Sequence, residues 1–134
     1  MAASSAAESA SPAASSPTLG SRFAEALGRK DFDGIIELLD PKVDFKGLTP
    51  GRTWEATSAE AVDGILHQWF EESDELEGIV ALESDSVSDR QRVAYRFHGR
   101  NPDGTFVVEQ QAYYAEAEGR INWMRVLCSG FRPR

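Results

Sequence analysis

The stretch YRFHGRNPDGTFVVEQQ, residues 95–111, predicts a β-hairpin and thereby points to the fold class of the chain. Its central NPDG favours a tight turn, and residues with β propensity flank that turn on both sides. Side chains two residues apart in a strand share a face. Arg96 therefore shares a face with His98, and Glu109 shares one with Gln111. A hairpin does not need this many polar groups for its own formation, so they predict a polar site.

Further extended segments lie on both sides of this hairpin. Runs of β-forming residues predict strands near residues 76–85, 89–100, 104–116 and 120–131, with a second reversal at EAEG. Consecutive strands joined by tight turns usually pair with each other. We therefore expect a four-stranded antiparallel meander.

Before these strands, the apolar residues recur with helical spacing. Leu19, Phe23 and Leu27 repeat at every fourth position and predict a first helix. Asp31 is a suitable N-cap for a second helix, which Pro41 ends. Each helix has one apolar face to bury against another element.

A short strand near residues 43–48, a loop and a third helix complete the pattern. The loop contains TPGRTWEA, and Thr57 with Glu60 fits a capping box for the helix. The apolar stripe of that helix consists of Val62, Ile65, Leu66, Trp69 and Phe70. Helices followed by a meander predict an α+β domain: a curved antiparallel sheet with three helices packed on its concave face. The space between helices and sheet is a natural pocket.

Composition narrows the functional class. The 134 residues are 41% hydrophobic and 27% charged, which suits one globular domain. A net charge of −8 argues against DNA, RNA or an anionic membrane surface, because Lys and Arg contacts to phosphate supply most nucleic-acid affinity. The single cysteine excludes an intrachain disulfide and favours a cytoplasmic location. No apolar run reaches the roughly 20 residues of a membrane helix.

The N-terminal stretch MAASSAAESASPAASSP lacks the basic start and apolar middle of a secretory signal. It has too few large apolar residues to offset the entropy of ordering. We therefore predict a disordered tail at residues 1–17 and a folded domain at residues 18–134.

Two segments resemble the nuclear-transport-factor-2-like (NTF2-like) superfamily in its broad SnoaL-like and ketosteroid-isomerase-like sense. They are FAEALGRKDFDGIIELLDPKVDF at residues 23–45 and GRINWMRVLCSGF at residues 119–131. The likeness extends over residues 18–131 and implies the cone-shaped, cystatin-like fold. The superfamily includes isomerases, epoxide hydrolases, cyclases and dehydratases, and also members that only bind or assemble. It further implies a homodimer formed through the outer sheet face.

The catalytic sets of these enzymes are incomplete in this sequence. Alignment places the isomerase's phenol donor on Phe23, its general base near Phe45 and its buried acid on Gln111, so steroid isomerisation is not supported. The Arg-x-Asp pair of the epoxide hydrolases reads Arg96-x-His98. The two histidines and one cysteine lack metal-ligand spacing, so no metal site is predicted. No motif implies a cofactor.

The same alignment predicts which side chains face the pocket. They are Ala94, Arg96, His98, Glu109, Gln111 and Tyr113 from the middle strands, and Met124, Val126 and Cys128 from the last strand. Val93, Tyr95 and Phe97 would then face outward, where their apolar character predicts the dimer contact. Trp54 is expected at the pocket mouth.

Two hypotheses follow. In the first, a small, largely apolar organic molecule enters the pocket, where His98 with Glu109 performs acid–base chemistry and Arg96 orients the ligand with Gln111 and Tyr113. Hydrolysis, cyclisation or isomerisation would be the reaction class. In the second, the polar network only neutralises itself. The protein is then a non-catalytic dimeric binding or assembly module whose cavity is filled by Phe23, Phe45, Met124 and tryptophan side chains. The sequence leaves open whether the protein is an enzyme.

Overall fold

The computed structural model describes residues 17–134, so nearly all of the predicted tail lies outside the described residues. The elements in chain order are α1 (Leu19–Gly28), α2 (Phe32–Leu38), β1 (Leu39–Thr49), β2 (Arg52–Ala56), α3 (Ala59–Trp69), β3 (Glu75–Val87), β4 (Arg90–Asn101), β5 (Gly104–Ala117), β6 (Arg120–Cys128) and β7 (Arg132–Pro133). Within the described part, no helix combines the length and apolarity that a membrane crossing requires.

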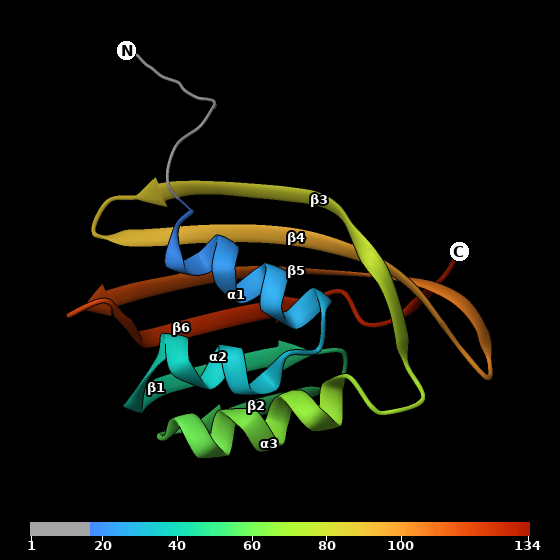
Figure 1. The fold of residues 1–134 in the computed structure, drawn as a ribbon, viewed down its shortest axis with the longest axis horizontal. Coiled ribbons are helices and arrows are strands. Elements are labelled where there is room, and N and C mark those ends of the chain that lie inside the picture. The colour runs from blue at the N-terminus through green and yellow to red at the C-terminus, as the bar shows by residue number, and fades with distance from the viewer. Residues whose placement is uncertain (1–16) are drawn as a thin grey trace, which may run out of the picture.

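The strands form one curved, open sheet with the order β2-β1-β6-β5-β4-β3, and the short β7 pairs with β5. Neighbours are antiparallel except β1 and β6, which run parallel. All three helices lie on one side of this sheet (Figure 1). We call the side that they cover the inner face and the opposite side the outer face. The predicted α+β architecture is confirmed.

Side-chain caps begin all three helices. Thr18 accepts a hydrogen bond from the Ser21 amide at the start of α1, and Asp31 accepts one from Gly34 at the start of α2. The cap of α3 is Ser58, whose hydroxyl accepts from the Ala61 amide. The prediction of Thr57 as this cap was therefore displaced by one residue.

The predicted reversals form, and the short strands β2 and β7 were not predicted. Residues 101–104 close the β4–β5 hairpin, and Glu118 and Gly119 turn β5 into β6 with φ values of 55° and 78°. The segment expected to be a loop instead contains β2, which folds back on β1 through Gly51 at φ 79°. Turn-forming residues marked this reversal, but the strand that follows it is only five residues long.

The core lies between the helices and the inner face. Phe23 of α1 packs near Tyr95 of β4, with ring centroids 6.5 Å apart, and the Gly20 amide donates to the Tyr114 hydroxyl at 2.9 Å. The prediction that Val93, Tyr95 and Phe97 face outward is therefore wrong: these side chains are at most 1% exposed and form the centre of the core.

Candidate functional site

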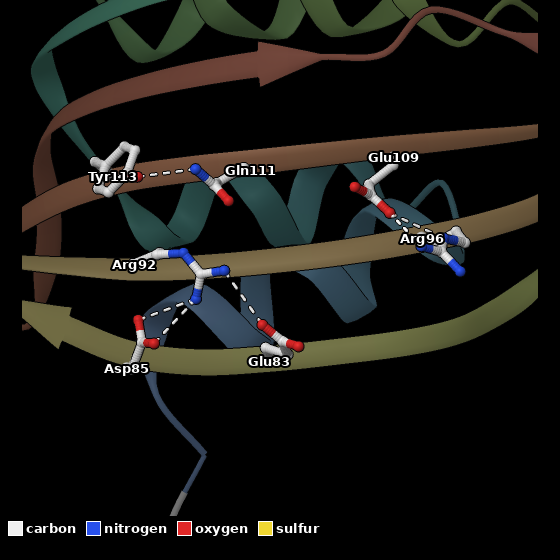
Figure 2. Close-up of polar contacts among 7 residues, drawn as sticks. All are labelled: Glu83, Asp85, Arg92, Arg96, Glu109, Gln111 and Tyr113. Carbon is white, nitrogen blue, oxygen red and sulfur yellow. Dashed lines mark hydrogen bonds and ion pairs between the residues drawn. The ribbon is translucent and has the colours of Figure 1, made fainter.

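The polar residues of the β4–β5 hairpin come together on the outer face (Figure 2). Arg96 and Glu109 lie opposite each other on neighbouring strands. The guanidinium donates to Glu109 Oε1 from Nε at 2.9 Å and from Nη2 at 2.7 Å. The two residues thus form an ion pair, and their side chains are 49% and 51% exposed. Exposed pairs of this kind contribute below about 1 kcal/mol to stability.

The other hairpin residues of the predicted site share that face. Gln111 Nε2 donates to the Tyr113 hydroxyl at 2.8 Å (Figure 2). His98 is half-buried and forms no side-chain hydrogen bond or ion pair with any residue in the range 17–134. Glu109 is engaged by Arg96 and does not form the predicted acid–base pair with His98.

The prediction that these side chains enter the space beneath the helices is wrong by one residue of register. Because strand side chains alternate, a slip of one position moves a whole row to the other face. On β4 the choice lay between Val93, Tyr95 and Phe97 on one face and Arg96 and His98 on the other. Burial in the core selects the apolar row. The family-based alignment had placed the polar row there.

The remaining predicted residues do lie on the inner side. Met124 and Val126 are buried and Cys128 is half-buried; they stand opposite Tyr114, Ala112 and Gln110 of β5. Phe23 and Phe45 are fully buried. Trp54 is half-buried, packs edge-on against Trp69 and donates from Nε1 to Thr49 Oγ1 at 2.8 Å. The predicted site is therefore divided between the two faces of the sheet.

A polar pair that the sequence prediction missed lies on the inner face. The Tyr95 hydroxyl donates to Gln110 Oε1 at 2.6 Å, and each residue is 1% exposed. Burial raises the pKa of the Tyr95 phenol well above its ordinary value, so the group stays protonated and neutral. A signal for this pair was present: Gln110 interrupts an apolar row that includes Val108 and Ala112.

Two buried donors near this part of the core have no partner. Gln110 Nε2 and Trp69 Nε1 form no hydrogen bond with the described residues. Rotating the Gln110 amide by half a turn exchanges its two ends and still leaves one unpaired. An unsatisfied buried polar group costs about 1–3 kcal/mol, so such atoms mark places where another molecule can supply the missing partner.

Acid–base groups are scarce on the inner side. Among the described residues, Asp74 and Gln110 are the only buried polar or charged side chains besides the tyrosines. Asp74 accepts hydrogen bonds from the Glu71 amide at 3.0 Å and from Asn101 Nδ2 at 2.9 Å. It therefore fixes the connection between α3 and β3.

The outer face carries three neighbouring hollows. An apolar one of about 280 Å³ is lined by Lys46, Gly47, Leu48, Thr53, Gln111, Tyr113, Arg125, Val126 and Leu127. A smaller one of about 180 Å³ is lined by Ala81, Glu83, Arg92, Ala94, Tyr95, Arg96, Glu109 and Gln111. The third, of about 470 Å³, is lined by Arg96, His98, Val107, Glu109, Ser129, Arg132, Pro133 and Arg134. Adjacent hollows share residues, so they follow one another across the sheet.

Arg92 forms a second ion network beside the middle hollow (Figure 2). Its Nη1 donates to Asp85 at 3.0 and 3.1 Å, and its Nη2 donates to Glu83 at 3.2 Å. The hydrogen bonds to Asp85 and then to Glu83 raise the pKa of the guanidinium above its already high value. This arginine is therefore engaged within the chain. No group of three or more potential metal ligands occurs among residues 17–134.

No protein-family model and no curated protein sequence matches the chain. Several solved structures, in contrast, match the chain in fold. A ketosteroid-isomerase-like protein from Catenulispora acidiphila, in complex with trimethylamine, is 13% identical with a TM-score of 0.68, and the match covers 86% of this chain and 88% of that one. A protein assigned as a polyketide cyclase from Xanthomonas campestris is 21% identical with a TM-score of 0.59, covering 81% and 86%.

An LEH-like epoxide hydrolase from M. tuberculosis is 14% identical with a TM-score of 0.60, covering 83% of this chain and 80% of the hydrolase. Identities this low show a shared fold and leave the activity of this chain open. The curved sheet with helices on one side is the architecture expected from these structural neighbours. The chain therefore has the cone fold of the NTF2-like superfamily, the fold that its sequence resemblance predicted.

Proposed function

We propose that the protein binds a small, largely apolar organic molecule between its helices and the inner face of the sheet. The observation that carries this proposal is the unpaired amide end of Gln110, a 1% exposed side chain in an otherwise apolar row. A ligand with one polar atom satisfies that group and buries its apolar part against the neighbouring inner-face side chains, which include Val108, Ala112 and Val126. Such a pocket opens by displacement of these side chains.

The inner side supports binding better than acid–base catalysis. A hydrolase, cyclase or isomerase of the predicted kind needs a group that takes up a proton near the ligand. Tyr95 holds its proton because burial raises the pKa of its phenol. Asp74 is engaged by backbone and amide donors. His98 and Glu109, the residues proposed for that role from the sequence, lie on the outer face. The neighbouring enzymes support the type of fold only.

A thermal-shift screen tests the proposal with the full chain and a panel of small hydrophobic carboxylic acids, terpenoids and polyketide-like aromatics. A ligand present at about 100 times its Kd should stabilise the fold by about 2.7 kcal/mol, which raises the Tm by several degrees. The Gln110→Met variant should lose this shift, because methionine fills a similar volume without the amide.

His98→Ala and Glu109→Ala are the matched controls, since both residues lie on the outer face. A ligand shift that survives in these two variants and disappears in Gln110→Met places the molecule inside. If instead the shift survives in Gln110→Met and disappears in His98→Ala, binding occurs on the outer face and the proposal is wrong. A panel that stabilises nothing also counts against it.

We further propose that the outer face forms a homodimer contact through the apolar hollow. Leu48 and Leu127 lie opposite each other on β1 and β6, and they are 48% and 53% exposed. The same hollow includes Lys46, which pairs in register with the acidic Glu55. Both signs of charge therefore border one apolar patch, an arrangement that a second copy related by two-fold symmetry can complement.

Sedimentation equilibrium tests this contact. Leu127→Glu should shift the mass from dimer to monomer, because it places a charge in the centre of the contact. Val87→Glu is the control, since Val87 is 51% exposed at the far end of β3. A Leu127→Glu protein with the mass of the wild type would exclude this contact.

A further inference from the structure

The hollow of about 470 Å³ at one end of the outer face differs in charge from the rest of the molecule. Its lining side chains include three guanidinium groups, from Arg96, Arg132 and Arg134, and one carboxylate, from Glu109. Their formal sum is +2, and Glu77, which pairs with Arg134 beside the hollow, reduces the local excess to +1, whereas the whole chain carries −8. A local excess of positive charge on an acidic protein attracts anions to one place.

The three arginines differ in whether a carboxylate of the chain pairs with their guanidinium group. Arg96 is bound to Glu109 at 2.7 Å, and Arg134 reaches Glu77 at 3.4 Å. Arg132 forms no ion pair or side-chain hydrogen bond with any residue of the described chain. The strand pairing of β7 with Phe106 and Val107 of β5 fixes its backbone beside the hollow. The Arg132 backbone is therefore held beside the hollow, and its guanidinium donors have no partner among the described residues.

The other polar groups of the hollow are consistent with an anionic occupant. His98 makes no hydrogen bond with the described residues, so a ring nitrogen is free to donate. The Ser129 hydroxyl accepts from the Glu109 amide at 2.9 Å and donates to the Gly130 carbonyl at 2.8 Å, and so is occupied. Glu109 is the one lining group that repels an anion, and Arg96 neutralises it.

We infer that this hollow binds a phosphate monoester through Arg132, the lining guanidinium whose charge no carboxylate of the described residues compensates. Arg132 is the main ligand in this assignment. A guanidinium offers paired donors in the geometry that phosphate oxygens accept. A phosphate monoester carries about −1.5 to −2 at pH 7, so it is attracted to this free guanidinium more strongly than a monoanion is. The site lies on the opposite side of the sheet from Gln110, so it is independent of the function proposed for the interior.

Isothermal titration of the full chain with phenyl phosphate tests the assignment at low ionic strength. Arg132→Ala should raise the Kd for phenyl phosphate by about tenfold or more, the usual effect of removing charge-assisted hydrogen bonds. Arg120→Ala is the matched control: Arg120 is an exposed arginine at the β5–β6 turn, outside the hollow, and its loss should leave the Kd unchanged. Phenyl sulfate, a monoanion of the same shape, should bind more weakly than phenyl phosphate.

Three outcomes overturn the inference: no measurable binding of phenyl phosphate, an equal loss of affinity in Arg120→Ala and Arg132→Ala, or equal affinity for the sulfate and the phosphate. The first shows that the hollow is not a site, and the other two show general attraction of anions to arginine. Inorganic phosphate that binds as tightly as phenyl phosphate also overturns the assignment of an ester. Leu127→Glu should retain binding, which separates this site from the proposed dimer contact.

Discussion

Replacing both members of the buried Tyr95–Gln110 pair should cost less stability than replacing one. Tyr95→Phe removes the hydroxyl that donates to Gln110 Oε1 and leaves both ends of a 1% exposed amide without a partner. A buried group left unsatisfied costs about 1–3 kcal/mol, so we expect the free energy of unfolding to fall by that amount. Gln110→Met leaves the tyrosine hydroxyl unpaired but also removes the amide donor that already lacks a partner. Its cost should be smaller, about 0–2 kcal/mol.

The double variant contains only apolar groups of similar shape at these positions. It should be within about 1 kcal/mol of the wild type, or more stable, because replacing both partners of a buried hydrogen bond removes both desolvation penalties. The sum of the two single effects should therefore exceed the double effect by about 1–3 kcal/mol, which is the coupling between the two residues. For a domain of this size, 1 kcal/mol corresponds to a change of about 4 °C in Tm.

Urea unfolding of the four proteins, followed by tryptophan fluorescence and by circular dichroism, measures this cycle. Coincident transitions with equal slopes permit the comparison of free energies. A double variant destabilised by the full sum of its single effects would refute the reasoning. That result would mean that the hydroxyl and the amide do not share a buried hydrogen bond.

Three further predictions concern stability. Because burial raises the pKa of the Tyr95 phenol, the folded state keeps a proton that the unfolded chain releases above about pH 10. This contribution to stability is complete below pH 10 and falls by up to about 1.4 kcal/mol per pH unit above it, and Tyr95→Phe should flatten the decline in urea titrations at pH 9 to 11. Gly20→Ala places a Cβ 2.6 Å from Cε1 of Tyr114, so it should destabilise by about 1–3 kcal/mol in thermal unfolding, more than the gain of about 1 kcal/mol in helix propensity. An alanine at position 20 that stabilises the fold would contradict this packing. Arg96→Ala and Glu109→Ala should each change the free energy of unfolding by less than about 1 kcal/mol, since their ion pair is half exposed. A larger loss in either would show that the pair is more buried than its exposure indicates.

The layout of the fold was predictable because each signal was local. Helical spacing of Leu19, Phe23 and Leu27 identified α1, and the NPDG turn identified the β4–β5 hairpin. Strand β2 was missed and the cap of α3 was misplaced in the prediction, and both errors also have local causes. Strand β2 is short and follows a turn, and the cap of α3 could be either of two adjacent hydroxyl residues. A helix cap at either of two adjacent hydroxyl residues has nearly the same local free energy.

The family alignment did not correctly assign the side chains of β4 and β5 to the inner and outer faces of the sheet. A shift of one position in an alignment exchanges the inner and outer rows of a strand. The apolar row of Val93, Tyr95 and Phe97 carried the better signal, because burying large apolar groups contributes more than any surface ion pair. On the last strand the two criteria agreed, and Met124 and Val126 were placed on the correct side.

The same correction changes which polar residue most needs a functional explanation. Arg96, Glu109 and Gln111 are paired with neighbours and in contact with solvent, so their polarity costs the fold little. Gln110 is different, because its buried amide has more hydrogen-bonding capacity than Tyr95 alone satisfies. A methionine there, combined with a phenylalanine at position 95, would serve packing equally well at a lower desolvation cost. A buried polar pair that adds little net stability to the isolated domain can stabilise a complex, and Gln110 is the inner-face residue whose free amide end a bound ligand would satisfy.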